Sequence, residues 1–314
     1  IITEKEQERI KNLIINKKIL IRNSSVEKNK IKINFYDDKS MKTSYGLLLQ
    51  NSSYSIATSN NSITISLSED FISSTKKNLL SQVKDILSNR IDQFGVVESS
   101  VQLSGSEKIV IQIPGIDAKD RERILNIISK TAMLEFKPVI QESKTRESLV
   151  SKYKVDLDQN AISDSLILYK MTDNSVGNDR FIITKKASLL KGTTIVDAYV
   201  SYDELNRPYV AFVLNSEGTK IFSQLTKKNI GNRIAIILDG KVKSAPVVQD
   251  QIFSRGSITG NFSFEQANDL SIILKSGSLP IPISILQEKT IGPSLGSDSI
   301  DKGKTSMIFA SILI

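Results

Sequence analysis

The sequence contains neither histidine nor cysteine. A Ser-His-Asp triad, a cysteine nucleophile and a zinc site made of histidine and cysteine are therefore excluded. The side chain that normally titrates near neutral pH is missing, and no disulfide framework can form. Carboxylate or lysine chemistry stays possible, so an enzyme is disfavoured rather than excluded. We expect no catalytic residues, no metal site and no cofactor.

The rest of the composition is ordinary. The 314 residues are 39% hydrophobic and 24% charged, which is typical of a chain that can bury a core. The formal net charge is +8. This excess is compatible with an anionic membrane surface or a nucleic acid, and equally with a basic surface that has no specific partner.

The chain begins at Ile1 without a methionine and ends on an apolar run of eight residues, 307–314. Charged residues stand just before this run, at Asp301, Lys302 and Lys304. Because a membrane-spanning helix needs about 20 residues, we interpret the run as the start of a transmembrane helix that is cut short. A buried strand or helix at a natural C-terminus is the alternative.

Residues 1–62 are expected to form a small N-terminal α/β subdomain. A segment rich in glutamate and lysine predicts the first helix, and strict alternation of apolar and polar residues predicts the first strand. Two asparagines, Asn60 and Asn61, break the chain before the next element. The expected elements are a helix at 3–15, a strand at 31–36, a helix at 42–49 and a strand at 54–58.

Residues 63–139 are expected to form a base with a ferredoxin-like βαββαβ fold. Its first helix carries apolar residues at helical spacing, and a glycine is well placed to end it. The expected elements are a strand at 63–67, a long helix ended by Gly95, strands at 101–103 and 109–113 with Pro114-Gly115 after them, a helix from Asp117 and a strand at 133–136.

Residues 140–285 are expected to form a second α/β lobe, the head, so the overall class is α+β. Asp239-Gly240 is a two-residue hairpin signal after a buried strand, and Ser263 with Gln266 forms a capping box. The polar stretches 141–178 and 286–292 are predicted hinges between head and base. The other expected elements are strands at 210–214, 234–238 and 257–260, a helix ended by Gly277, and a return linker at 286–306.

Two patterns imitate nucleotide or nucleic-acid sites. Gly303-Lys304-Thr305 resembles the end of a phosphate-binding loop, but Asp298 stands where that loop needs a glycine. A ferredoxin-like unit can bind RNA through aromatic residues on its two central strands. The strands at 63–67 and 109–113 carry none. We therefore expect neither nucleotide nor nucleic acid as a ligand.

Motif-like segments follow one another between residues 63 and 314. They lie at 90–96, 111–116, 131–136, 229–231, 235–240 with 244–246, 257–260, 276–280 and 291–296. In this order they resemble the motifs of the SecD family, membrane subunits of the bacterial protein-export machinery. The set and its order are far more specific than any single segment. Residues 1–62 match this family less sharply.

The resemblance implies a domain on the periplasmic side of the inner membrane. It implies SecF and the SecYEG channel as partners, unfolded preproteins as substrates, and the proton gradient as the energy source. The family's proton-carrying residues lie in transmembrane helices that this chain does not contain, so no residue here inherits that role. A passive periplasmic scaffold for membrane partners is the alternative, and a carboxylate-dependent hydrolase is a third class.

Two sets of site residues follow. The residues that match family motifs are implied to have structural roles; they are Arg90, Phe94, Gly95, Pro114, Gly115, Asp239, Gly240, Pro246, Gly277, Pro280, Gly292, Pro293 and Gly296. A protein that handles unfolded chains also needs apolar surface and exposed strand edges, because backbone hydrogen bonding recognises any sequence. The candidate substrate surface is Ile252, Phe253, Ile258 and Phe262. The alternative is that these four residues are core.

Overall fold

The computed structural model describes residues 2–96, 98–153, 161–163, 166–173, 178–186, 190–289 and 304. The chain divides into two compact units, Ile1–Pro282 and Ile283–Ile314, and all elements named below belong to the first. In the described part of the chain, no helix is both long and apolar enough to cross a membrane. The predicted start of a transmembrane helix at 307–314 lies outside the described residues, as does most of the predicted return linker.

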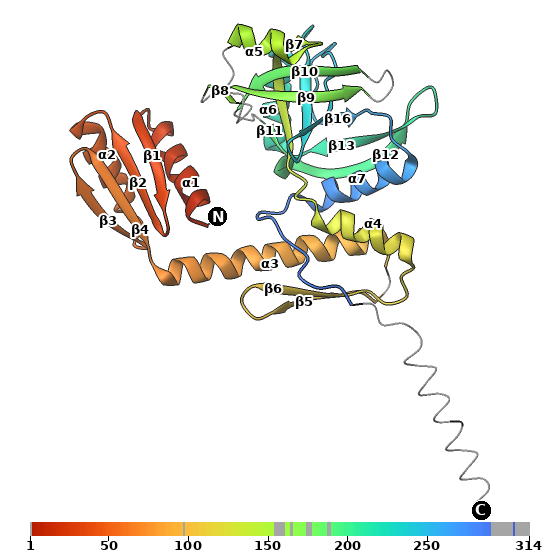
Figure 1. Ribbon diagram of the computed structural model, residues 1–314, viewed down its shortest axis with the longest axis horizontal. Coiled ribbons are helices and arrows are strands. Elements are labelled where there is room, and N and C mark those ends of the chain that lie inside the picture. Colours follow the sequence, from red (N-terminus) through yellow and green to blue (C-terminus); the bar gives the residue numbers. More distant parts are fainter. Residues whose placement is uncertain are drawn as a thin grey trace, which may run out of the picture. The chain divides into compact units, whose positions relative to one another are not determined.

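The N-terminal part is a four-stranded antiparallel sheet in the order β1-β2-β4-β3, with two helices packed against it (Figure 1). Apolar residues alternate along β2 and β4, so one face of the sheet is buried under the helices and the other faces water. The predicted elements of this part are confirmed, and β1 is additional. Their bounds are α1 (Ile2–Asn16), β1 (Ile21–Glu27), β2 (Lys30–Phe35), α2 (Asp38–Leu48), β3 (Tyr54–Ser59) and β4 (Ser62–Leu67).

The placement of β4 differs from the predicted ferredoxin-like base. Asn60 and Asn61 both have positive φ, 39° and 59°, and form a two-residue turn that pairs β3 with β4 as a hairpin. The strand therefore completes the first sheet. The four strands of the predicted unit belong to three sheets, so the single ferredoxin-like sheet is a wrong prediction. The predicted boundaries after residues 62 and 139 cut through β4 and β7 (Leu134–Ser143).

We call residues 69–130 the base. It consists of the long helix α3 (Glu69–Phe94), the two-stranded hairpin of β5 (Ser100–Ser104) and β6 (Lys108–Gln112), and α4 (Ala118–Ser129). Gly95 ends α3 in the left-handed conformation, with φ 90°. Gly115, with φ 65°, turns the chain from β6 toward the N-cap of α4. These two glycine positions are as the sequence predicts.

We call residues 134–276 the head. Its larger sheet has seven strands, in the order β15-β14-β7-β10-β9-β8, with β11 also paired to β7. The first half of β7 pairs with β14 and the second half with β10. The described parts of the stretch 141–178 therefore belong to the head, and the prediction that this stretch is a hinge between head and base is wrong. The bounds are α5 (Arg146–Tyr153), β8 (Ala161–Ser163), β9 (Leu166–Asp173), β10 (Asn178–Lys185), β11 (Leu190–Lys191), β14 (Ile234–Leu238) and β15 (Lys241–Ser244).

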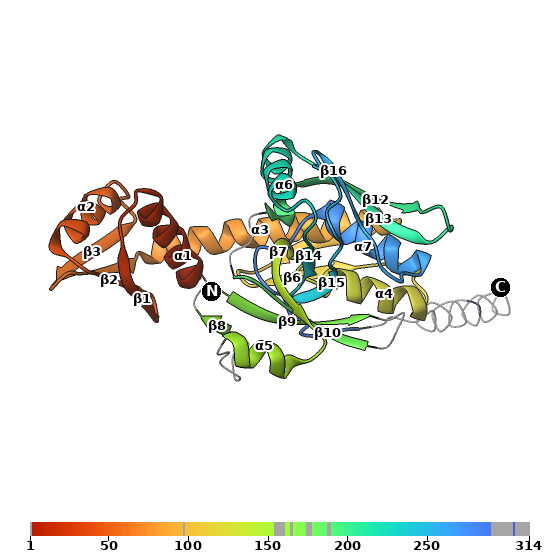
Figure 2. The same cartoon turned by 90° about the horizontal axis from the view of Figure 1, so that it is seen from above.

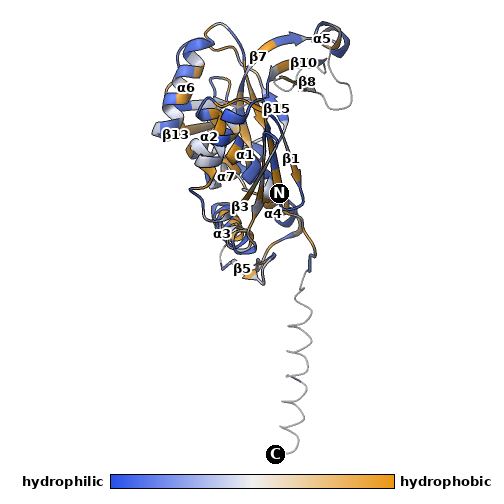
Figure 3. Ribbon diagram, turned by 90° about the vertical axis from the view of Figure 1, so that its left-hand side faces the viewer, coloured by the Kyte–Doolittle hydropathy of each residue, from blue (hydrophilic) through white to orange (hydrophobic). Residues whose placement is uncertain are grey.

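A second head sheet, in the order β12-β13-β16, lies on the other side of β7 and β14 from β9 and β10 (Figure 2). All five residues of β14 are buried, with alternate residues in two different cores, which explains its continuous apolar sequence. In Figure 3 the hydrophobic colour gathers on the strands, whereas α6 is mostly hydrophilic. The bounds are a 3₁₀ turn at Gly192–Thr194, β12 (Ile195–Tyr202), β13 (Pro208–Leu214), α6 (Ser216–Lys228), β16 (Arg255–Ile258) and α7 (Phe264–Ser276).

The main core of the head lies between β7, β14, the second sheet and the helices α6 and α7. Three phenylalanines, Phe136, Phe212 and Phe222, form its centre, with ring centroids 5.3–6.1 Å apart. The predicted capping box of Ser263 and Gln266 begins α7. This helix also packs on the base through a smaller cluster that contains Ile127, Ala132, Ile272 and Ile273.

Candidate functional site

Four stretches that are far apart in sequence meet where the chain passes between base and head. They are Arg90 near the end of α3, residues 130–133 between α4 and β7, Asp239 in the turn from β14 to β15, and residues 277–279 after α7. We call this cluster the junction. Each stretch overlaps one of the motif-like segments of the sequence.

Arg90 is the centre of the junction and is fully buried, with 0% of its surface exposed. Its Nη1 donates to the carbonyls of Ile127, Ile128 and Lys130, at 2.8, 3.3 and 2.5 Å. Its Nη2 donates to the carbonyl of Gly277 at 3.0 Å. One guanidinium therefore holds the C-terminal ends of both α4 and α7.

Helix physics accounts for this arrangement. The last carbonyls of a helix have no partner within it, and together they carry a partial negative charge. Because α4 and α7 lie side by side in the same direction, two such ends meet. Arginine suits the position because its planar group offers five donors. Burial lowers the pKa of Arg90 to about 10, opposed by the nearby carboxylate of Asp239, so the group stays charged at neutral pH.

Asp239 ties the head's hairpin turn to the same place. Asp239 and Gly240 both have positive φ, 50° and 74°, as the predicted turn requires. The Asp239 carboxylate accepts hydrogen bonds from the backbone N–H groups of Met133 at 2.8 Å and Ala132 at 3.3 Å, and from the hydroxyl of Thr131. The turn was predictable from the sequence, whereas this contact with the entry segment of the head was not.

The two chain crossings lie next to each other. The head begins after residues 130–133 and ends before residues 277–279, and the N–H of Leu279 donates to the carbonyl of Thr131 at 2.8 Å. Arg90 binds a carbonyl in each crossing, at Lys130 and at Gly277. The junction therefore contains the covalent connection from base to head and the start of the segment that leaves the head, and its geometry sets how the head is held.

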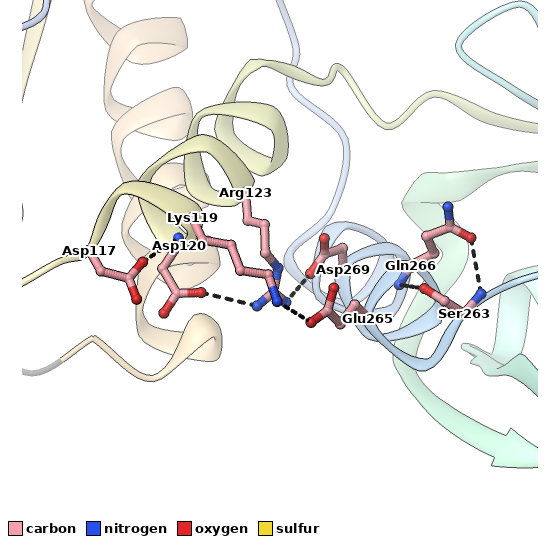
Figure 4. Close-up of polar contacts among 8 residues, drawn as sticks. All are labelled: Asp117, Lys119, Asp120, Arg123, Ser263, Glu265, Gln266 and Asp269. Atoms are coloured by element: carbon pink, nitrogen blue, oxygen red, sulfur yellow. Dashed lines mark hydrogen bonds and ion pairs between the residues drawn. The ribbon is translucent and has the colours of Figure 1, made fainter.

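The N-terminal ends of α4 and α7 are joined by charged side chains (Figure 4). Lys119 contacts Glu265 at 2.8 Å, and Arg123 contacts Asp269 at 2.7 Å. The partners lie four residues apart on each helix, so two successive turns match. The hydrogen bond that Arg123 donates to Asp269 raises the pKa of Arg123, and the one that Lys119 donates to Glu265 lowers the pKa of Glu265. We call these contacts the α4–α7 ion pairs. Sequence analysis missed them, although i, i+4 charges on both helices were a usable signal.

The predicted substrate surface is only partly a surface. Ile258 is fully buried, because it pairs with Val210 in the second head sheet and belongs to the main core. Ile252 and Phe262 are partly buried and pack against that core. Phe253 alone is exposed, at 59%. The four residues therefore do not form one accessible patch, and the inclusion of Ile258 is a wrong prediction.

A groove beside β12 has exposed aromatic side chains on its rim, whereas the predicted substrate surface has one exposed residue. Strand β12 has a strand partner on one side only within the described residues. Near its other edge, the Asp197 carboxylate accepts the N–H of Ala198 at 3.0 Å and pairs with Lys275 of α7 at 3.3 Å. Beside this edge lies a hollow of about 250 Å³. Tyr199 and Phe264 on its rim are 45% and 56% exposed. The lining residues are Gln93 from α3, Ala198, Tyr199 and Val200 from β12, and Phe264, Asn268, Ser271, Ile272 and Lys275 from α7.

The remaining motif residues have structural positions. Phe94 packs on the small cluster between base and head, and the carbonyl of Pro246 accepts the N–H of Ile234 at 3.1 Å. Pro280 lies in the segment that leaves the head. Gly292, Pro293 and Gly296 lie outside the described residues. Across the described ranges, no group of three or more acidic, histidine or cysteine residues is arranged to hold a metal ion.

Two family models match this chain, and together they cover the residues of the junction. Residues 80–141 match the family model "Protein translocase subunit SecDF, P1 domain, N-terminal", and residues 166–281 match "SecDF, P1 head subdomain". Arg90 and residues 130–133 fall in the first match, and Asp239 with residues 277–279 in the second. The junction therefore joins the two matched segments.

Similar proteins include the protein translocase subunit SecD of Desulfurispirillum indicum, 40% identical over 250 residues, which cover 77% of this chain and 46% of that protein. The SecD subunit of Aquifex aeolicus is 38% identical over 250 residues, 80% of this chain and 47% of its own length. The chain thus spans less than half the length of these relatives.

Two solved structures are also similar. One is described as "Structure and function of a membrane component SecDF that enhances protein export", with a TM-score of 0.52 and 31% identity, covering 68% of this chain and 94% of that chain. The other is a crystal structure of SecDF in a super-membrane-facing form, with a TM-score of 0.54 and 31% identity, covering 75% of this chain and 31% of that chain.

Proposed function

The chain belongs to the SecD family of protein translocase subunits, and we propose that it is the periplasmic part of such a subunit, which binds unfolded preproteins as they emerge from the export channel. SecF and the SecYEG channel are the proposed partners at the inner membrane. The proton gradient would drive the cycle through transmembrane parts that lie outside this chain.

The groove beside β12 carries the proposal. An extended chain can add to a free strand edge through main-chain hydrogen bonds, which do not depend on its sequence. Exposed aromatic groups on the rim, Tyr199 and Phe264, offer apolar contact to whichever side chains are bound. A translocating preprotein is unfolded and passes through many sequences, so a subunit that assists it needs this kind of weak and general binding.

The arrangement of base and head supports a second part of the proposal, that the two move as separate bodies. Each has its own helices and strands, and the covalent connection between them lies in the junction. Gln93 of the base forms one wall of the groove, whereas the other walls belong to the head. A change in the angle between base and head would therefore alter the groove and could couple movement to release of the bound chain.

A photo-crosslinking experiment tests preprotein binding. A photoreactive phenylalanine analogue replaces Tyr199 or Phe264, and the 314-residue chain is mixed with an unfolded secretory precursor. We expect crosslinks at both positions and few at Tyr36, which is 65% exposed and follows β2 in the N-terminal part of the chain. Phe253→Asp tests the remaining exposed residue of the predicted surface. Equal crosslinking at all positions would contradict a site in the groove.

The passive scaffold is the second candidate function. It is supported by the small size of the groove, about 250 Å³. A scaffold would bind its membrane partners but would neither crosslink to the precursor nor delay its folding, so the same experiment separates the two functions.

A further inference from the structure

The two ends of the contact between α4 and α7 are built from different chemistry. At the C-terminal ends, the buried guanidinium of Arg90 binds four backbone carbonyls, and the segments by which the chain enters and leaves the head lie beside it. At the N-terminal ends, the helices are joined by the α4–α7 ion pairs, where no covalent connection passes.

Water can reach the second end and not the first. The side chains of Lys119 and Glu265 are 70% and 52% exposed, and those of Arg123 and Asp269 are 23% and 22% exposed. Exposed ion pairs exchange readily for hydration and are screened by salt. The carbonyls bound by Arg90 would instead be left buried without a partner if that end separated, which is costly.

Among the described residues, a small apolar contact lies between the two ends. It consists of four buried residues, Ile127, Ala132, Ile272 and Ile273, with Phe94 beside them. The guanidinium of Arg123 lies 4.8 Å from the centre of the Phe94 ring, so part of this contact depends on the ion-paired end. Separation of the helices would therefore begin at the N-terminal ends and turn about the C-terminal ends.

We infer that the α4–α7 ion pairs are a latch and that the Arg90 end is the pivot for opening the head from the base. Opening the latch moves α7 away from α4 and α3. The groove then widens, because its walls on β12 and α7 move away from Gln93 on α3. The latch rests on the proposed movement of head and base as two bodies, and it does not depend on preprotein binding. Its closed state is favoured at low ionic strength.

A distance measurement between spin labels tests the latch. The chain has no native cysteine, so Gln82→Cys on α3 and Gln224→Cys on α6, both at exposed positions, accept one label each. The probe is the distance distribution in the 314-residue chain. Lys119→Glu places like charges together, and the double variant Lys119→Glu with Glu265→Lys restores an opposite pair. Lys76→Glu is the matched control, because it breaks an exposed ion pair with Glu107 within the base.

We expect Lys119→Glu to raise the ratio of open to closed distances about fivefold, the double variant to return it toward the parent, and Lys76→Glu to leave it unchanged. Potassium chloride at about 1 M, where the screening length is about 3 Å, should open the parent chain and have little effect on Arg123→Gln with Lys119→Gln. One distance distribution in all variants and salt concentrations would overturn the latch, while crosslinking at Tyr199 would still stand on its own. A shift as large in Lys76→Glu would overturn it too.

Discussion

Replacement of Arg90 gives the sharpest test of how the junction is stabilised. Arg90→Met keeps a long apolar side chain in the space but removes all donors, so four carbonyls in two helix ends lose their partner. Each buried acceptor left unpaired costs about 1–3 kcal/mol. Relief from burying the guanidinium charge offsets part of this sum. We expect a net loss of about 3–5 kcal/mol, near the low end of the sum for four unpaired acceptors.

Arg90→Lys separates charge from geometry. One ammonium can take the place of Nη1, which binds the end of α4, but it cannot also reach the carbonyl of Gly277, which Nη2 binds. We expect an intermediate loss of about 1–3 kcal/mol. Arg22→Met, which removes an exposed arginine on β1, is the matched control and should stay within about 0.5 kcal/mol of the parent.

The assay combines urea unfolding with hydrogen exchange read by mass spectrometry. Unfolding gives the total loss, and exchange locates it. In Arg90→Met, amides at the ends of α4 and α7, near residues 125–133 and 271–280, should exchange faster than in the parent. If Arg90→Met unfolds within about 1 kcal/mol of Arg22→Met, or if exchange rises evenly along the chain, Arg90 does not hold the two helix ends.

Three further predictions concern other parts of the molecule. Burial raises the pKa of Tyr54 to about 12, so folding favours the neutral phenol. The stability that this group adds should be complete below about pH 10 and lost between about pH 10 and 12. In an ultraviolet titration, Tyr54→Phe should remove the last of the tyrosine phases. At Gly256 an added Cβ would lie 2.3 Å from Cζ of Phe212, so Gly256→Ala should lower the unfolding free energy by about 1–3 kcal/mol. Gly46 on α2 faces open space, so Gly46→Ala should raise the unfolding free energy by about 0.5–1 kcal/mol. Equal effects of the two variants in urea unfolding would contradict the packing argument. Ser263→Ala removes the cap of α7 and should cost about 1 kcal/mol, which Ser263→Asp should largely restore.

Local features of the fold were predictable from the sequence because their signals are local. The end of α3 at Gly95, the turn at Asp239-Gly240 and the cap at Ser263 each follow from a few neighbouring residues. The buried strand β14 followed from an apolar run, since a strand with cores on both faces has no polar side.

The pairing between strands was harder to predict from the sequence than the strands themselves. Alternation identifies β4 as a strand but does not say which strand it joins, and the decisive turn at Asn60-Asn61 looked like a simple break. Strand β1 was missed because Ile21–Glu27 is mostly polar and lies at a sheet edge. Ile258 was misplaced for a related reason, since its burial depends on its pairing with Val210.

The candidate site was predictable only in part. The motif segments that resemble the SecD family pointed to the residues of the junction, but not to what they touch. Most partners of Arg90 and Asp239 are backbone groups, which every residue carries and which therefore leave no trace in the sequence. The groove was missed because its walls come from three elements that only the tertiary structure brings together.

The hydrogen bond between Leu279 and Thr131 has a consequence for engineering of the chain. It joins the segment just before the head to the segment just after it, so the chain enters and leaves the head at one place. A different domain whose termini lie close together can therefore replace the head between these two segments without lengthening any other connection. Arg90 and the helices of the base would keep their positions in such an exchange.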